Sequence, residues 1–139
     1  MHIGRCTGRL AVAAAAVAAI SVGGVADAAT SSISIAGTAQ LKARGAAVVT
    51  HVVVQCPAGY QGQAQVGVSE RVARNHVTSG GGGVSFTCTG SRQTLGVPAT
   101  PFDRPFKVGV AFAQASLFAY DPQTGTSVSD NAYRTIQIT

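Results

Sequence analysis

Apolar and polar residues alternate with a period of two along most of the chain after Ala28, and this pattern constrains the fold more than any other feature. In Ser32–Lys42, for example, Ile33 and Ile35 are flanked by polar or small residues, as in a strand that is buried on one face. Glycine, proline, asparagine and aspartate interrupt the runs, and no window has the i, i+3, i+4 apolar spacing of a helix. The alternation therefore predicts an all-β domain.

Seven runs have the length and pattern of strands separated by turns, which is typical of a β-sandwich or a small barrel. We expect an antiparallel sandwich. The run at 46–56 has apolar residues in both phases, which predicts a central strand that is covered, at least in part, on both faces. The predicted strands are Ser32–Lys42, Ala46–Cys56, Gln63–Val72, Val84–Cys88, Arg92–Ala99, Phe106–Tyr120 and Ala132–Thr139.

Two segments carry more specific expectations. Gly80–Gly83 is expected at the flexible tip of a hairpin, because glycine adopts positive φ freely and loses much entropy when it is ordered. In Phe106–Tyr120, we expect Val108, Val110 and Phe112 to share the inward face, with Leu117 beyond a bend.

The N-terminus has the organisation of a secretory signal peptide. Arg5 and Arg9 precede an apolar run at 10–22, and residues 26–28 read Ala-Asp-Ala, an A-x-A cleavage site. The run is shorter than the roughly 20 apolar residues that a bilayer-spanning helix needs. We therefore expect residues 1–28 to be a signal peptide and residues 29–139 to be one secreted, extracellular domain. No second apolar run follows, so we expect no membrane insertion after cleavage.

Two cysteines, Cys56 and Cys88, follow the expected cleavage site. An even number of cysteines in an exported chain is typical of a disulfide. Closing a loop of about 33 residues stabilises a fold by about 3–4 kcal/mol in the chain-entropy model. Redox and metal roles are disfavoured, because the sequence has no C-x-x-C and no histidine cluster beside either cysteine. The pair is therefore predicted to be a structural disulfide.

Charged residues give no indication of nucleic-acid binding. The eight basic and four acidic residues after Ala28 are scattered, whereas a nucleic-acid site would gather bases in a stripe with interleaved aromatics. Gly80–Gly83 lacks the Lys-Ser/Thr and the helix of a phosphate loop, and no G-x-S-x-G nucleophile motif is present. We expect no nucleic-acid partner, no catalytic residue and no cofactor.

The titratable residues offer isolated candidates. His51 is expected on the polar face of a strand, and His76 lies beside the glycine run. Glu70 and Asp103 could act together only if the fold brought their carboxyl groups to one bond. The loop from Asp121 to Asp130 has hydroxyl oxygens for a weak Ca²⁺ site, but it lacks the alternating acids of an EF-hand. No metal site is predicted, because a site needs three or four ligands.

Aromatic residues supply the candidate binding surface. Pro98–Phe106 is stiffened by three prolines, and its two phenylalanines are expected in the core of a crossover between the sheets. The alternative is a rigid binding loop, since an ordered loop loses less entropy on binding. The candidate surface consists of Tyr60, Phe102, Phe118, Tyr120 and Tyr133.

Three stretches, His51–Pro57, Val84–Gly90 and Ala111–Phe118, together with the alanine-rich leader, resemble small uncharacterised secreted proteins of actinobacteria. This resemblance implies an immunoglobulin-like antiparallel β-sandwich of about seven strands and no activity. The chain is also similar in size and compartment to the neocarzinostatin-type apoproteins, which carry a chromophore in a cleft, and to the subtilisin-inhibitor family. Both families usually have two disulfides, whereas this chain can form one.

We therefore expect an extracellular, non-catalytic binding or structural module, whose partner is an extracellular protein or a cell-wall polymer. The alternative is a small-ligand carrier that resembles the neocarzinostatin-type apoproteins. A carrier needs an apolar cleft of roughly 300 Å³ or more, whereas a binding module needs an exposed patch.

Overall fold

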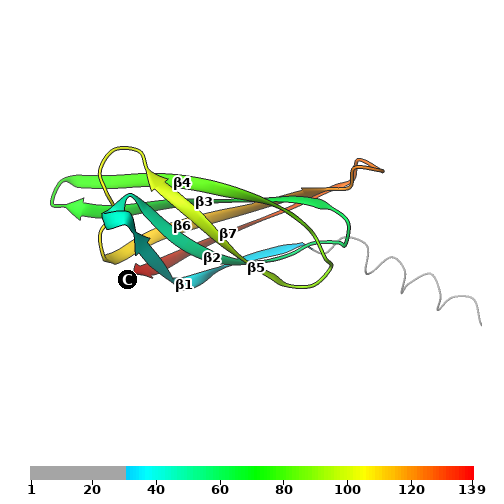
Figure 1. Cartoon of the computed structure of the whole chain (residues 1–139), viewed down its shortest axis with the longest axis horizontal. Coiled ribbons are helices and arrows are strands. Elements are labelled where there is room, and N and C mark those ends of the chain that lie inside the picture. The colour runs from blue at the N-terminus through cyan, green and yellow to red at the C-terminus, as the bar shows by residue number, and fades with distance from the viewer. Residues whose placement is uncertain (1–30) are drawn as a thin grey trace, which may run out of the picture.

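The computed structural model describes residues 31–139, which form seven strands and one short 3-10 turn (Figure 1). The expected signal peptide at 1–28 lies outside the described residues. Within residues 31–139, no helix is long and apolar enough to cross a membrane. The elements are β1 (Ser32–Lys42), η1 (Ala43–Gly45), β2 (Ala47–Gln55), β3 (Gln61–Ala73), β4 (His76–Thr87), β5 (Gln93–Pro101), β6 (Gly109–Tyr120) and β7 (Ser127–Ile138).

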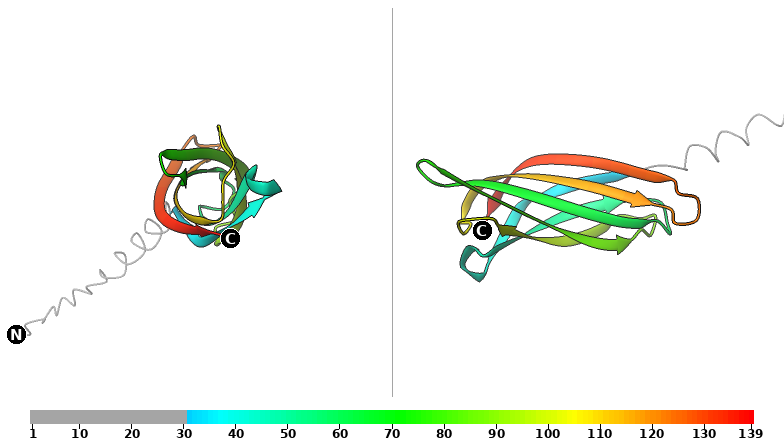
Figure 2. Two further views of the ribbon diagram at one scale, coloured as in Figure 1. Left: turned by 90° about the vertical axis from the view of Figure 1, so that its left-hand side faces the viewer. Right: turned by 90° about the horizontal axis from the view of Figure 1, so that it is seen from above.

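The all-β class and the seven strands are confirmed, but the strands close into a barrel rather than an open sandwich. Their order around the barrel is β1-β2-β5-β4-β3-β6-β7, and the end-on view in Figure 2 shows the ring. Pairing is extensive within β1-β2-β5 and within β4-β3-β6-β7. The two groups meet at two places, where β4 pairs with β5 and where β1 pairs with β7, through two residue pairs each. We call these two short stretches of pairing the seams. These seams convert the expected sandwich into a barrel.

At the seam between β1 and β7, side chains replace backbone pairing where the strands diverge. The carboxylate of Asp130 accepts a hydrogen bond from the amide of Ile33 at 2.9 Å. The guanidinium of Arg134 donates to the carbonyl oxygen of Ile35 at 2.8 Å. Both bonds satisfy backbone groups on the open edge of β1, which would otherwise lack protein partners.

The glycine run Gly80–Gly83 lies inside β4 and pairs with β3, so the expected hairpin tip is wrong. The turn between β3 and β4 lies instead at residues 74–75. A Cβ atom at Gly80 or Gly82 would overlap backbone atoms of β5, well inside the 3.0 Å that real Cβ atoms keep from other atoms. Glycine is therefore required at these two positions, because the backbones of β4 and β5 come close together at the seam. A glycine inside a strand often marks such a close approach of another backbone.

β6 is one continuous strand, and its phase is opposite to the prediction. Alanines at alternate positions face the core together with Leu117, whereas Val110 and Phe112 are exposed. The core already contains bulky side chains from elsewhere in the fold, including Ile33 on β1, Val54 on β2 and Phe106 in the β5–β6 connection, so small residues on β6 complete the packing. The apolar side chains that were expected inside are consequently available on the outer surface.

β2 is a central strand as predicted, with one face fully covered and the other covered in part. Val48, Thr50, Val52 and Val54 are buried, whereas the residues between them are only half-buried. The β-branched residues of the outer phase suit a strand conformation without being core residues.

Thr50 is fully buried, and its hydroxyl oxygen has no hydrogen-bond partner in the described protein. An unpaired buried hydroxyl costs about 1–3 kcal/mol. Thr78 is also fully buried, but its hydroxyl donates to the carbonyl oxygen of Arg104 at 2.6 Å. The two threonines are therefore equally buried and differ in one respect: the hydroxyl of Thr78 is hydrogen-bonded, and that of Thr50 is not.

Thr50→Val is expected to raise the free energy of unfolding by about 1 kcal/mol, because a methyl group of similar shape replaces an unsatisfied hydroxyl. Thr78→Val, the control, is expected to lower it by about 1 kcal/mol or more, because it removes a bonded hydroxyl. Urea unfolding of the two variants and the wild type measures both changes. A loss of stability in Thr50→Val would contradict this account of the core.

The predicted disulfide joins the chain just after β2 to the chain just after β4. Cys56 and Cys88 are bonded, with Cα atoms 5.5 Å apart, and both are buried. They pack with Ala119, and Tyr60 and Phe86 cover this small cluster. The bond therefore fastens one end of the barrel, where the two strand groups lack a seam of their own.

Candidate functional site

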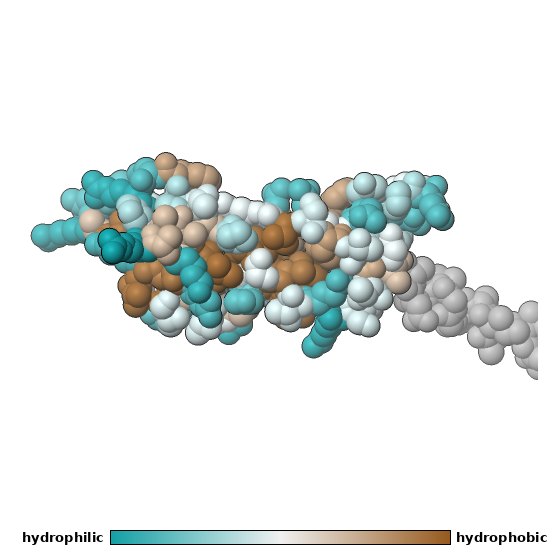
Figure 3. All heavy atoms as spheres, viewed as in Figure 1, coloured by the Kyte–Doolittle hydropathy of each residue, from teal (hydrophilic) through white to brown (hydrophobic). Residues whose placement is uncertain are grey.

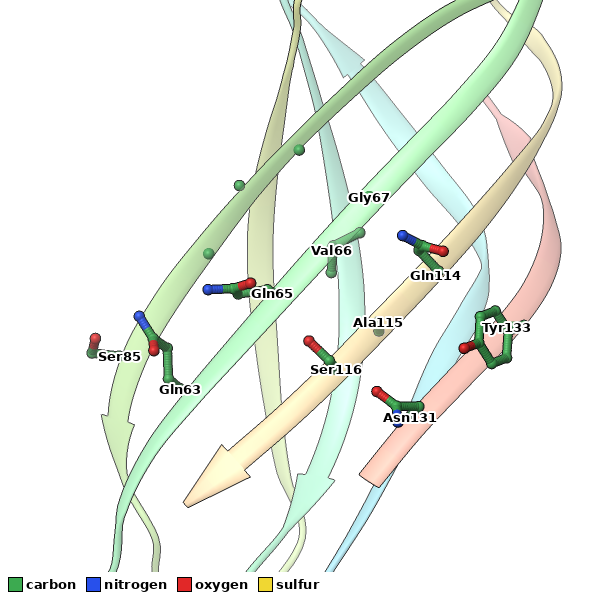
Figure 4. A pocket seen from close by; sticks show the side chains of 13 residues that line it. Gln63, Gln65, Val66, Gly67, Ser85, Gln114, Ala115, Ser116, Asn131 and Tyr133 are labelled. Carbon is green, nitrogen blue, oxygen red and sulfur yellow. The ribbon is translucent and has the colours of Figure 1, made fainter. Parts of the chain in front are cut away.

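The outer face of β4-β3-β6-β7 carries aligned rows of uncharged polar side chains. The register places Gln65 on β3 opposite Ser116 on β6, and Ser116 opposite Asn131 on β7. The next row runs from Gly67 through Gln114 to Tyr133 in the same way. Figure 4 shows these side chains on one side of the sheet. They point outward because strand residues alternate between the two faces and the intervening residues fill the core.

This face is hollowed where β3 and β4 carry glycines in place of side chains. A hollow of about 630 Å³ lies over Gly67 and Gly81–Gly83, bordered by the amide, hydroxyl and aromatic residues of the two rows. A second hollow of about 360 Å³ shares Gly67 and Gln114 with the first and extends between Phe102 and Phe112. We call the two together the outer groove. None of its lining residues is charged.

Aromatic rings border the outer groove. Phe112 and Tyr133 lie nearly parallel, with ring centroids 6.4 Å apart and an angle of 15° between the planes. Tyr133 is 67% exposed and Phe102 is 80% exposed. Figure 3 shows one long side of the barrel, where a band of apolar residues runs from the middle towards one end and polar residues surround it. The groove therefore combines polar side chains with exposed rings.

The five aromatic residues of the predicted surface do not form one patch. Tyr133 and Phe102 line the outer groove. Phe118 and Tyr120 contact each other farther along β6, with ring centroids 6.3 Å apart. Tyr60 is half-buried against the disulfide cluster.

The expectation that both phenylalanines of Pro98–Phe106 lie in the core is correct for one of them. Phe106 is 2% exposed, whereas Phe102 projects from the connection between β5 and β6. Phe102 is held at the rim because its amide donates to the carbonyl oxygen of Ser79 at 2.9 Å. The exposed ring of Phe102 therefore agrees with the alternative expectation, in which this segment is a stiff loop that presents an aromatic residue.

Sequence reasoning missed Phe112, Gln65, Gln114 and Asn131. Phe112 was expected on the inward face, and no role was predicted for the three amides. The available signal was the repetition of glutamine at alternate positions, 61, 63 and 65. Alternation places these three side chains on one face, but only the register with β6 and β7 shows which residues lie beside them.

The titratable groups near the groove fix the loop that carries Phe102. His76 and Asp103 form an ion-pair contact of 3.0 Å. Hydrogen bonds from the amide of Arg104 and then from His76 hold the pKa of the Asp103 carboxyl below its ordinary value. The buried carboxylate of Glu70 accepts from the amide of Lys107 at 2.7 Å. Glu70 on β3 thus holds the β5–β6 connection at Lys107, whereas Asp103, within that connection, is held against His76 and Thr78 on β4.

The other candidates of the sequence have separate places. His51 is half-buried on the outer face of β2, beside Gly96. The carboxylate of Asp121 accepts hydrogen bonds from the amide of Gln123 and the hydroxyl of Thr124, within its own loop. Asp130 is engaged at the β1–β7 seam. Among residues 31–139, no group of three or more His, Cys, Asp or Glu side chains is placed to hold a metal ion.

Among solved structures, the chain is similar to Spo0M, a sporulation control protein from Bacillus subtilis, with 17% sequence identity and a TM-score of 0.37. The match covers 80% of this chain and 49% of the Spo0M chain, so the chain spans about half the length of that protein. No protein-family profile matches the chain, and no curated protein matches it.

Proposed function

We propose that the protein is an exported, non-catalytic binding module that takes its ligand in the outer groove. The observation that carries this proposal is the groove itself, a hollow with uncharged amides and exposed rings on a paired sheet. Each lining strand is paired along the groove, so the binding groups are held in place before a ligand arrives. A site on strands loses less entropy on binding than a site on mobile loops.

The compartment and the fold relationship are part of the same proposal. The sequence at 1–28 has the organisation of a signal peptide, and a disulfide between Cys56 and Cys88 is typical of oxidising, extracellular environments. The grouping of strands as β1-β2-β5 and β4-β3-β6-β7 supports an immunoglobulin-like ancestry, with the sandwich closed at its two seams.

A binding module fits better than a small-ligand carrier. The carrier alternative needs an apolar cleft between the sheet and the loops, whereas the interior is filled by core residues such as Val52, Val66 and Leu117. Both hollows of the outer groove lie on the outside of the barrel; the larger one is lined mainly by polar groups, and the smaller one, between Phe102 and Phe112, is more apolar. An open groove whose larger part is polar suits part of a larger partner, such as an extracellular protein or a cell-wall polymer.

Ser116→Arg is expected to abolish ligand binding, because it places a large charged side chain between Gln65 and Asn131 in the middle of the groove. The secreted protein is incubated with immobilised cell walls and, separately, with immobilised extracellular proteins of its host. The wild type is expected to be retained on one of them, and Ser116→Arg to weaken retention at least about tenfold.

Thr94→Arg is the matched control, because Thr94 is an exposed residue on the outer face of β5, in the other strand group. It is expected to bind as the wild type does. Equal retention of Ser116→Arg and Thr94→Arg, or no retention of the wild type on either support, would contradict the proposal.

A further inference from the structure

We propose that the ligand of the outer groove is an uncharged glycan chain; this inference rests on the proposed binding function and assigns its ligand class. Three features of the groove favour this ligand: the chemistry of its lining side chains, its aromatic rings and its shape.

The polar lining has the hydrogen-bonding character that sugar hydroxyls require. Gln65, Gln114 and Asn131 each present an amide with both donors and an acceptor, and Ser116 presents a hydroxyl that can do either. A sugar hydroxyl likewise donates and accepts, so such groups pair with one another in many geometries. An alkyl or lipid ligand would leave these groups unpaired after excluding water, at a cost of about 1–3 kcal/mol for each.

The absence of charge among the lining residues favours a neutral chain over an anionic one. An anionic ligand would lose its hydration without gaining a cation, and unpaired charges are the costliest groups to desolvate. The nearest basic position along β3 is Arg71, which lies two residues beyond Ser69 and outside the lining.

The rings supply the apolar part of sugar recognition. One face of a pyranose ring presents C–H groups, and the negative face of an aromatic ring attracts their partial positive charge. Tyr133 and Phe112 lie nearly parallel at the edge of the groove, and Phe102 stands at the far side of its second hollow. A sugar unit that stacks on Tyr133 therefore lies within the same hollow as Gln114 and Asn131.

The groove is long and open, as an extended polymer requires. It follows β3 from Gln63 to Ser69, a distance of roughly 20 Å at the rise of an extended strand. Its floor at Gly67 and Gly81–Gly83 has no side chains, so a flat ring can approach the backbone closely. Gly81 and Gly83, which alternate along β4 with the glycines that the seam with β5 requires, thus leave the hollow without side chains.

The test is affinity electrophoresis of the secreted protein in gels that contain one soluble polysaccharide each. The neutral probes are an unbranched β-glucan, dextran, a galactomannan and an arabinan, and the charged probe is polygalacturonate. The wild type is expected to be retarded by at least one neutral probe and to migrate freely in polygalacturonate. Retardation by polygalacturonate alone, or by no probe, would overturn the inference.

Variants connect the retardation to the groove. Tyr133→Ala is expected to weaken binding at least about tenfold, whereas Tyr133→Phe, which keeps the ring, stays within about threefold. Tyr120→Ala is the matched control, because Tyr120 is an exposed ring on β6 outside the groove lining. Tyr133 is 67% exposed, so its replacement leaves the fold intact, as thermal unfolding can verify. Equal losses in Tyr133→Ala and Tyr120→Ala would contradict the assignment.

Periodate and wall-degrading glycoside hydrolases together separate this inference from the proposed function, because periodate cleaves the vicinal diols of sugars, the hydrolases cleave chains whose linkage leaves no such diol, and both leave most of a protein support intact. If retention on the host's walls is sensitive to Ser116→Arg but survives both treatments, the groove binds a ligand of another class and the glycan inference fails alone. If retention is lost after either treatment, the glycan assignment is supported. If Ser116→Arg never alters retention, both proposals fail.

Discussion

Gly82→Ala is expected to lower the free energy of unfolding by about 3 kcal/mol or more, and to prevent folding if the barrel is only marginally stable. The added methyl would overlap the carbonyl oxygen of Pro98, which is a backbone atom and has no rotamer to escape into. Moving β5 aside would disturb its pairing with β2, where Pro98 lies opposite Val49. Equilibrium urea unfolding measures the effect.

Gly96→Ala is the control for this substitution. Gly96 lies on the neighbouring strand β5, and a Cβ there would meet Val49 at 3.5 Å, an ordinary van der Waals distance. Its stability is expected to stay within about 0.5 kcal/mol of the wild type, because an exposed alanine in a strand costs little. A similar stability for the two variants would show that β4 and β5 do not cross as closely as the seam requires.

Removing the disulfide with Cys56→Ala and Cys88→Ala together is expected to cost about 3 kcal/mol. The bond closes a loop with a sequence separation of 32, and both cysteines are buried in a small cluster with Ala119. Most of the loss comes from the greater freedom of the unfolded chain, with an added contribution from the smaller buried side chains. Unfolding of the wild type with and without reductant checks the bond without a substitution.

The position of the disulfide gives this prediction a local signature. Amide exchange in the double variant is expected to rise first near Tyr60 and Gly90, whose backbone groups are hydrogen-bonded to residues of the disulfide. The middle of the outer groove is expected to keep its protection, because it is held by the pairing of β3 with its neighbours. Unchanged stability on reduction would contradict the role assigned to the bond.

The strands themselves could be predicted from the sequence. Which face of a strand points inward could be predicted only where the larger side chains of the strand are also the buried ones. In β1, Ile33 and Ile35 are both the largest residues and the inward ones, so the predicted phase is correct. In β6 the alanines face inward and Phe112 faces outward, so a rule that buries the bulkier set gives the wrong phase. The space available inside depends on side chains from distant strands, which periodicity along one segment does not contain.

The glycine run and the groove share a second reason for being missed. Gly80–Gly83 looked flexible because glycine is usually chosen for its backbone freedom, whereas Gly80 and Gly82 are required by the closeness of β5. The amides of the groove come from strands far apart in the sequence, and Gln65 and Asn131 lie in one row, on either side of Ser116, only through the register of β6. The close approach of two backbones and the pairing register between neighbouring strands depend on residues far apart in the sequence. Neither property leaves a pattern in the local sequence.

The division of β3 and β6 into inward and outward residues has an evolutionary consequence. The outward side chains of the groove, such as Gln65, Gln114 and Tyr133, are not core residues, so exchanging them leaves the barrel's packing unchanged. Lineages that descend from a common ancestor could therefore diversify what the groove recognises while they keep one scaffold. Selection would act on Gln65, Gln114 and Tyr133 for recognition, and separately on Gly82 and the cysteines for survival of the fold.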